Sequence, residues 1–166
     1  GNALSLDETD VCMNIMPMFH IGGLVDLLVA PLYAGGSVVL SPAFSADSIP
    51  HLVREYQPSW TQVVPTMLDD ICRHLGNNPE SLTGNGRLEY VRCVAAKLPV
   101  ELSERFEAIF GIPVIEVYGM TETTTLIATN PLPPGIRKPG SVGPAAGPEL
   151  AVMDENGNML PADTAG

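Results

Sequence analysis

The stretch VYGMTETTT, residues 117–125, holds side chains of the types that could bind a nucleotide. An aromatic ring such as that of Tyr118 can stack on a base, and a hydroxyl such as that of Thr121 can donate a hydrogen bond to a phosphate oxygen. The carboxylate of Glu122 can hold a magnesium ion, and Gly119 lets the chain turn between these groups. None of these residue types is specific alone. The alternative is a threonine-rich strand after an ordinary glycine turn.

The elements that must position this stretch alternate between apolar runs and segments of helical period. This order is typical of an α/β fold in which a mostly parallel sheet is flanked by helices. The expected strands cover residues 11–17, 37–40, 60–64, 90–96 and 112–118, and the expected helices cover residues 20–33, 45–56, 65–75 and 99–111. The VYGMTETTT stretch lies at the carboxyl end of the last strand, where ligands of open α/β sheets bind.

The segments between and after the predicted strands and helices also have sequence patterns that indicate their conformation. We expect residues 77–86, NNPESLTGNG, to form a loop, and the spacing of Glu101 and Arg105 on the last helix allows them to pair. Past residue 130 the chain is rich in Pro and Gly, and it ends in a predicted β-hairpin that turns at Asn156 and Gly157. We therefore divide one domain into residues 1–130, the α/β segment with the chemical motifs, and residues 131–166, an irregular connection followed by the hairpin.

The composition excludes several classes of function. Of the 166 residues, 45% are hydrophobic and only 16% are charged, which favours a segment inside a larger body. The net charge of -11, with eight scattered Lys and Arg residues, argues against a nucleic-acid partner. The longest apolar stretch, residues 21–33, is too short to span a bilayer, and no secretory signal opens the chain.

The number and spacing of the cysteines indicate a reducing compartment. Cys12, Cys72 and Cys93 form no CxxC pair, so we expect small buried core residues with reduced thiols, as in a cytoplasmic protein. His51 and His74 lie on amphipathic helices and are expected to be solvated. Asp69 and Asp70 are adjacent and do not share a helix face, so they are expected to serve the helix surface rather than paired acid catalysis.

The motif YGMTE, taken with PMFH at residues 17–20, resembles the adenylate-forming superfamily of acyl-CoA ligases, luciferases and peptide-synthetase adenylation domains. The similarity continues in RCVAAKLPVELSERFEAIFGIPVIEVYGMTE and in NPLPPGIRKPGSVGPAAGPELAVMDENGN, so it covers nearly the whole chain. It implies an enzyme that uses ATP to convert a carboxylic acid to an acyl-adenylate (acyl-AMP) and then passes the acyl group to coenzyme A (CoA). The stretches EVYGMTET and NPLPPGIRKPGSVG look most like ligases of the oxalate-CoA ligase type.

The resemblance assigns roles to individual residues. It implies that Tyr118 stacks on adenine and that Gly119 lets the backbone come close to the nucleotide. It also implies that Thr121 contacts the α-phosphate and that Glu122 coordinates magnesium (Mg). His20, in MPMFHIGG, corresponds to the family's histidine at the edge of the acyl pocket; without the resemblance it would be interpreted as a hydrogen-bonded core residue.

The stretch VAAKLP, residues 94–99, aligns with the family's loop of small residues beside adenine. Ala95 and Ala96 fit that loop, because small side chains let the backbone approach a flat base. Lys97 departs from the small or proline residue usual at its position. It is either a solvated surface lysine or a cation that reaches a phosphate or the acyl carboxylate.

The family's other parts would lie outside residues 1–166. The phosphate loop would come before Gly1, and the ribose-binding aspartate, the hinge and the small C-terminal domain would come after Gly166. We therefore expect an internal segment of the large N-terminal domain of an acyl-CoA synthetase, inactive without the remainder of the parent enzyme. Two alternatives are a dinucleotide-binding oxidoreductase, disfavoured because no GxGxxG follows an early strand, and a non-catalytic structural or nucleotide-binding module.

Overall fold

A computed structural model describes residues 4–84 and 86–166. In these residues six strands form one sheet in the order β2-β1-β3-β4-β5-β6. The first five strands along the chain run parallel, and the last runs antiparallel to β5. The strands are β1 (Val11–Asn14), β2 (Ser37–Leu40), β3 (Trp60–Val63), β4 (Tyr90–Cys93), β5 (Val114–Met120) and β6 (Thr125–Thr129). The predicted fold class, a mostly parallel sheet flanked by helices, is confirmed.

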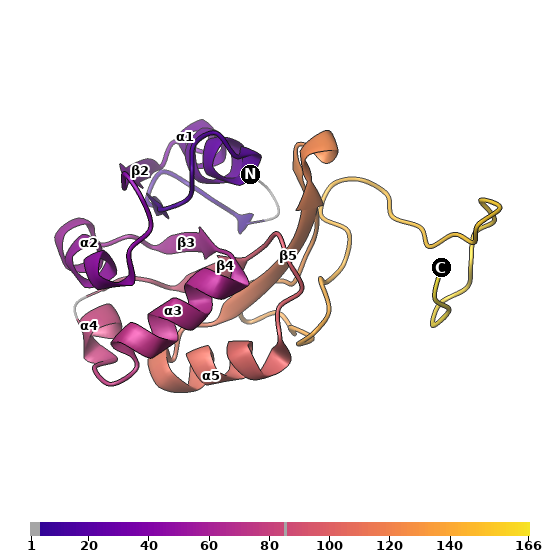
Figure 1. The fold of residues 1–166 in the computed structure, drawn as a ribbon. Helices are drawn as coiled ribbons and strands as arrows, with labels where there is room; N and C mark the ends of the chain where they lie inside the picture. Colours follow the sequence, from indigo (N-terminus) through magenta and orange to yellow (C-terminus); the bar gives the residue numbers. More distant parts are fainter. Residues whose placement is uncertain (1–3, 85) are drawn as a thin grey trace.

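Helices cover both faces of the sheet (Figure 1). One face carries the short η3 (Ala46–Ser48) with α2 (Ile49–Tyr56), α3 (Pro65–Leu75), α4 (Glu80–Thr83) and α5 (Val100–Phe110). The other face carries a π-helix, η2 (Gly22–Val29), that continues into α1 (Ala30–Tyr33). A short turn of 3₁₀-helix, η4 (Thr121–Thr123), joins β5 to β6.

Two hydrophobic cores follow from this arrangement. The first lies under α2, α3 and α5 and includes Phe106, Leu68 and Val63. The second lies on the opposite face and includes Trp60 and Leu27, with Leu27 coming from η2. Strands β3 and β4 are buried at every position, as expected for central parallel strands that are covered on both faces.

The first crossover connection passes over one face of the sheet, and the later crossover connections pass over the other face. After β1 the chain crosses through η2 and α1 to β2, whereas after β3 it crosses through α3 on the other face to β4. The carboxyl ends of β1 and β3 therefore lie at a switch point, which is the usual place of a ligand in a doubly wound sheet. The first helix is less buried than its apolar sequence suggests, since Tyr33 at its end is 88% exposed.

Two local predictions were wrong. Residues 80–83 of the predicted loop form α4, with Pro79 as the residue before the helix, while Asn85 of that stretch lies outside the described residues. Arg105 pairs with Asp69 of α3 rather than with Glu101, so the ion pair joins two helices instead of two turns of one helix.

The described residues after Thr129 contain no further helix or regular strand. Arg137 anchors this segment to the sheet side by pairing with Glu107 and donating to the Val114 carbonyl oxygen at 3.0 Å. The predicted hairpin is reduced to one bridge between Met153 and Met159, in a segment that runs away from the sheet (Figure 1). Within the part of the chain that the structure describes, no helix has the length and apolar character needed to cross a membrane.

Candidate active site

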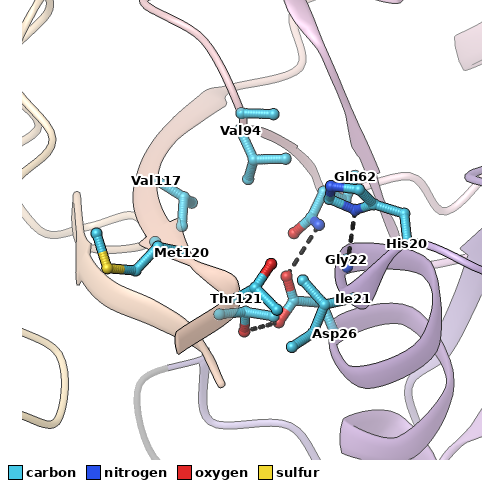
Figure 2. Close-up of a pocket in the computed structure, with 12 residues that line it drawn as sticks. His20, Ile21, Gly22, Asp26, Gln62, Val94, Val117, Met120 and Thr121 are labelled. Carbon is cyan, nitrogen blue, oxygen red and sulfur yellow. Dashed lines mark hydrogen bonds between the residues drawn. The ribbon is translucent and has the colours of Figure 1, made fainter. Parts of the chain in front are cut away.

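A cavity of about 200 Å³, here cavity A, lies at the carboxyl ends of the central strands. Its walls come from the chain after β1, from β3, from the end of β4 and from the β5–β6 turn (Figure 2). The polar side chains that line it are His20, Asp26, Gln62, Thr121 and Thr125. Strands that are far apart in sequence thus bring a set of polar groups to the edge of the sheet predicted for ligand binding.

Asp26 is the centre of a polar network in cavity A. The residue is buried, at 8% exposed, and its Oδ2 accepts a hydrogen bond from Gln62 Nε2 at 3.0 Å. Its Oδ1 accepts a hydrogen bond from the hydroxyl of Thr125. A carboxylate removed from water needs such donors, and these two tie η2 to β3 and β6.

His20 lies at the start of the same helix. It is exposed, so it is not a core histidine, and its Nδ1 accepts a hydrogen bond from the Gly22 backbone N–H at 3.1 Å. The helix start is pressed onto the loop after β1: a Cβ at Gly23 would lie 2.3 Å from the Pro17 carbonyl oxygen. Asn14 Nδ2 donates to the Gly23 carbonyl at 2.9 Å, and this contact fixes the helix against β1.

A second cavity of about 390 Å³, here cavity B, lies beside cavity A. Its walls include Ala95, Ala96 and Lys97 after β4, Tyr118 and Gly119 of β5, and Gly140 of the later connection. Tyr118 is 44% exposed. Small side chains on one side and an accessible aromatic ring on the other are the features that a flat base requires.

The two cavities meet at the end of β5. Ala95, Val117 and Gly119 line both of them. Ala95 has a φ of 72°, an uncommon conformation for a residue with a Cβ. The register of β5 against β6 shifts between Tyr118 and Gly119, and this bulge turns the end of the strand between the two cavities.

Glu116 closes cavity B from the strand side. Its Oε1 accepts a hydrogen bond from the Gly140 N–H at 2.7 Å, and burial raises the pKa of its carboxyl group. The contact holds the Pro/Gly-rich connection against β5. Sequence reasoning had no role for this residue.

The two remaining predicted residues, Thr121 and Glu122, take different places relative to the cavities. Thr121 lines cavity A rather than cavity B, and Glu122 is exposed on η4 and lines neither. Among the described residues, no group of three or more His, Cys, Asp and Glu side chains could hold a metal ion. The structure therefore gathers His20, Thr121 and the residues of cavity B at one edge, while Glu122 stands outside both cavities.

The model of the AMP-binding enzyme family matches residues 1–166. The chain belongs to the AMP-binding enzyme family. This finding confirms the resemblance seen in YGMTE and PMFH.

Among the relatives, oxalate–CoA ligase of Arabidopsis thaliana is 38% identical over 157 residues, which are 93% of this chain and 30% of that protein. Sulfoacetate–CoA ligase of Cupriavidus necator is 39% identical over 156 residues, which are 94% of this chain and 30% of that protein. The chain thus spans about 30% of the length of these relatives. The crystal structure of ATP-bound MatB from Rhodopseudomonas palustris matches with a TM-score of 0.85 at 29% identity and covers 98% of this chain and 31% of that one.

Besides Glu116 and Thr125, three polar side chains in or beside cavity A were not predicted from the sequence as site residues. Asp26 and Gln62 line cavity A, and Arg92 of β4 lies opposite Gln62 in the sheet. The sequence does single out each of them, because each is a lone charged or amide residue inside an otherwise apolar run, and burying such a residue costs free energy. Such a residue is therefore a candidate functional residue even where no motif contains it.

Proposed function

We propose that this chain is part of an AMP-forming acid–thiol ligase, an acyl-CoA synthetase. The full protein would activate a carboxylic acid with ATP as an acyl-adenylate and transfer the acyl group to CoA. In the first step a carboxylate oxygen bonds to the α-phosphorus and pyrophosphate leaves. In the second step the CoA sulfur bonds to the acyl carbon and AMP leaves.

The observation that carries the proposal is the meeting of the two cavities at Ala95, Val117 and Gly119. Adenylation needs an acid and a nucleotide held with their reacting atoms adjacent. Cavity A has side chains such as His20 and Thr121 that can donate hydrogen bonds to an acid, and cavity B has small side chains and an aromatic ring that suit adenine. The end of β5 between them is then the place where carboxylate and α-phosphate would approach.

The residues fit the nucleotide well. Tyr118 would stack on adenine, and the exposed backbone at Ala95 and Ala96 would lie along the base. Thr121, on the cavity A side, would donate its hydroxyl to an α-phosphate oxygen, where negative charge builds in the transition state. His20 would orient the acid at the edge of cavity A.

The residues of the candidate site could supply part of the coordination of a magnesium ion. Glu122 is the carboxylate expected to bind it, and an exposed carboxylate on a short turn can serve as one ligand. Mg²⁺ keeps several waters and commonly takes only one or two protein carboxylates with substrate phosphates, so a single glutamate suffices in the presence of ATP. When bound, the metal would neutralise phosphate charge.

The names of the relatives suggest the class of acid. Oxalate and sulfoacetate each carry a second anionic group close to the carboxylate that would be activated. We propose that the parent protein likewise acts on a small acid with a second anionic group, of which oxalate is one example.

We also propose that the isolated chain binds nucleotide without forming acyl-adenylate. Glu122 is its candidate magnesium ligand, and Lys97 is the one lysine or arginine among the described residues that line the two cavities, which is little of the charge stabilisation that adenylation needs. A reducing, cytoplasmic location is supported by the three free buried thiols.

The test is calorimetric titration of AMP with magnesium into this chain, into Tyr118→Ala and into the control Tyr33→Ala. Loss of stacking should raise the Kd of Tyr118→Ala by about tenfold or more. Tyr33, 88% exposed on α1 and outside both cavities, should leave the Kd unchanged. Equal losses in both variants, or acyl-adenylate formation by the full-length protein without any dependence on Tyr118, would refute the assignment of cavity B.

Glu122→Gln separates metal binding from base stacking. In the full-length protein we expect this variant to lose adenylation while keeping the affinity for adenosine, because adenosine carries no phosphate. Pyrophosphate exchange with a panel of mono- and dianionic acids measures the reaction. A panel in which long-chain fatty acids greatly exceed oxalate and sulfoacetate would overturn the proposed substrate class.

A further inference from the structure

A row of buried polar side chains lies on the sheet face beneath cavity A. Strands β3 and β4 place Trp60 opposite Tyr90 and Gln62 opposite Arg92. The Trp60 and Tyr90 rings stack with centroids 5.9 Å apart, and the Arg92 guanidinium lies 5.8 Å from the Trp60 ring centroid. Arg92 is only 2% exposed. The sheet therefore holds a cation in its interior.

This cation is under-partnered within the described residues. Neither Nε nor Nη2 of Arg92 has a hydrogen-bond partner, and the Oε1 of Gln62 across the strand has none either. Burial lowers the pKa of Arg92, and the negative charge of Asp26 is the largest influence that opposes this effect. An arginine kept only for packing would normally fill its hydrogen bonds, because burying a charge without partners is costly.

Arg92 is connected to cavity A through its neighbours. Gln62, opposite it, and Val94, two residues later on the same face, both line the cavity. Gln62 uses its Nε2 to bond the Asp26 carboxylate, which also lines the cavity. Gln62 is thus both the strand neighbour of the buried cation and a hydrogen-bond donor to the cavity's carboxylate.

The charge of Asp26 poses a problem for an anionic substrate. Its carboxylate in the cavity wall would repel an acid with a second anionic group. Among the described residues that line cavity A there is no lysine or arginine. The cation that faces Asp26 from inside the sheet is Arg92.

We propose that Arg92 is a positioning residue that sets the acid selectivity of cavity A. Its buried charge offsets that of Asp26 and makes the cavity more favourable to the second anionic group of the substrate. The inference rests on the proposed ligase function. It requires no movement of Arg92 into the cavity, since charge acts at a distance in a poorly solvated interior.

The experiment compares two acids of equal carbon number, oxalate and acetate, in the full-length protein. Formation of AMP is followed at steady state, and the quantity compared is the oxalate-to-acetate ratio of kcat/KM. Arg92→Met keeps the length and apolar contact of the side chain and removes its charge. We expect the ratio to fall by about tenfold or more, mainly through a higher KM for oxalate. Arg92→Lys, which keeps the charge, should retain most of the ratio.

Two further variants make the outcome decisive. Arg54→Met removes an exposed arginine of α2 and should leave the ratio unchanged. Asp26→Asn removes the opposing charge and should raise the ratio, which also provides a test if Arg92→Met does not fold. Equal loss for both acids in Arg92→Met would mean a structural role only and would overturn the inference. A parent protein that activates no acid would overturn the ligase proposal as well, whereas an active protein with an unchanged ratio overturns the role of Arg92 alone.

Discussion

The hydroxyl of Thr125 donates a hydrogen bond to the carboxylate of Asp26, although the two residues are 99 positions apart in the chain. Both residues are buried and both line cavity A. The bond fastens the π-helix η2 to β6, the strand that follows the VYGMTE turn. The long-range contact therefore helps to define the site that neither segment forms alone.

Replacing Thr125 with Val keeps the β-branched shape and removes the donor. Asp26 stays buried with one hydrogen bond fewer, so we expect the free energy of unfolding to fall by about 1–3 kcal/mol. Urea unfolding measures the change. Thr123→Val is the matched control, because its exposed hydroxyl bonds only the Met120 carbonyl, and it should cost less than about 0.5 kcal/mol. Similar losses in the two variants would contradict a special role for the Asp26 contact.

The thiols should be unreactive in the folded protein. All three cysteines are buried, and burial raises the pKa of Cys93 to about 12 from the ordinary 9.0. Because the thiolate is the nucleophile, alkylation of Cys93 at pH 8 should be about a thousandfold slower than that of a free cysteine. Iodoacetamide labelling followed by mass spectrometry should find three slow thiols before unfolding and three fast ones in urea. Rapid labelling of the native protein would show that the cores open readily.

The raised pKa of Cys93 also makes the free energy of unfolding depend on pH. The folded pKa of Cys93 is raised, so the folded protein keeps a proton that the unfolded chain loses as pH rises above 9.0. The contribution of this thiol is therefore complete below pH 9.0 and is lost as pH rises towards 12. Cys93→Ser should flatten this alkaline loss in urea titrations, and an unchanged slope would contradict it.

The fold could be predicted from local patterns because each strand is an apolar run and each long helix has an apolar stripe. Local patterns do not predict the features that depend on contacts between residues far apart in the chain. The π-helical geometry of η2 coincides with the bond from Asn14 to the Gly23 carbonyl, which depends on how the helix docks on β1. Similarly, Arg105 meets Asp69 only because α3 and α5 pack side by side, and a helical wheel of α5 alone favours Glu101.

The candidate site could be predicted only in part from the sequence, for the same reason. A local motif contains Tyr118, Gly119 and Thr121, and the sheet topology brings them to the expected edge. Asp26 and Gln62 belong to no motif and meet only through the tertiary fold. Glu122 illustrates the opposite case, since its motif is clear but it lines neither cavity.

Asp69 forms one ion pair within α3 and a second that joins α3 to α5. Asp69 contacts Arg73 of its own helix at 2.6 Å and also Arg105 of α5. We expect Asp69→Asn to lower the free energy of unfolding by about 0.5–1 kcal/mol at low salt, and by less at high salt, because the pairs are partly exposed. Asp70→Asn changes the neighbouring carboxylate and should be nearly neutral. An Asp70 variant as costly as Asp69→Asn, or no dependence on salt, would count against the inter-helix pair.

Lys97 offers a test of where phosphate lies relative to cavity B. Its side chain belongs to a loop that lines the cavity with Tyr118, and it is exposed. If the cation contributes to nucleotide binding, its effect must grow with the number of phosphate charges. Lys97→Met in the full-length protein should then weaken ATP by about three- to tenfold at low salt and leave adenosine nearly unchanged.

The chain's other lysine, Lys138, lines neither cavity, so Lys138→Met controls for the change in net charge. Competition binding of ATP, AMP and adenosine at two salt concentrations separates the possible results. A graded loss from ATP to adenosine that disappears in salt places the Lys97 cation near the phosphates. Equal loss for all three ligands would instead mean that the substitution distorts the 95–98 loop, and no loss for any of them would make Lys97 a solvated surface residue.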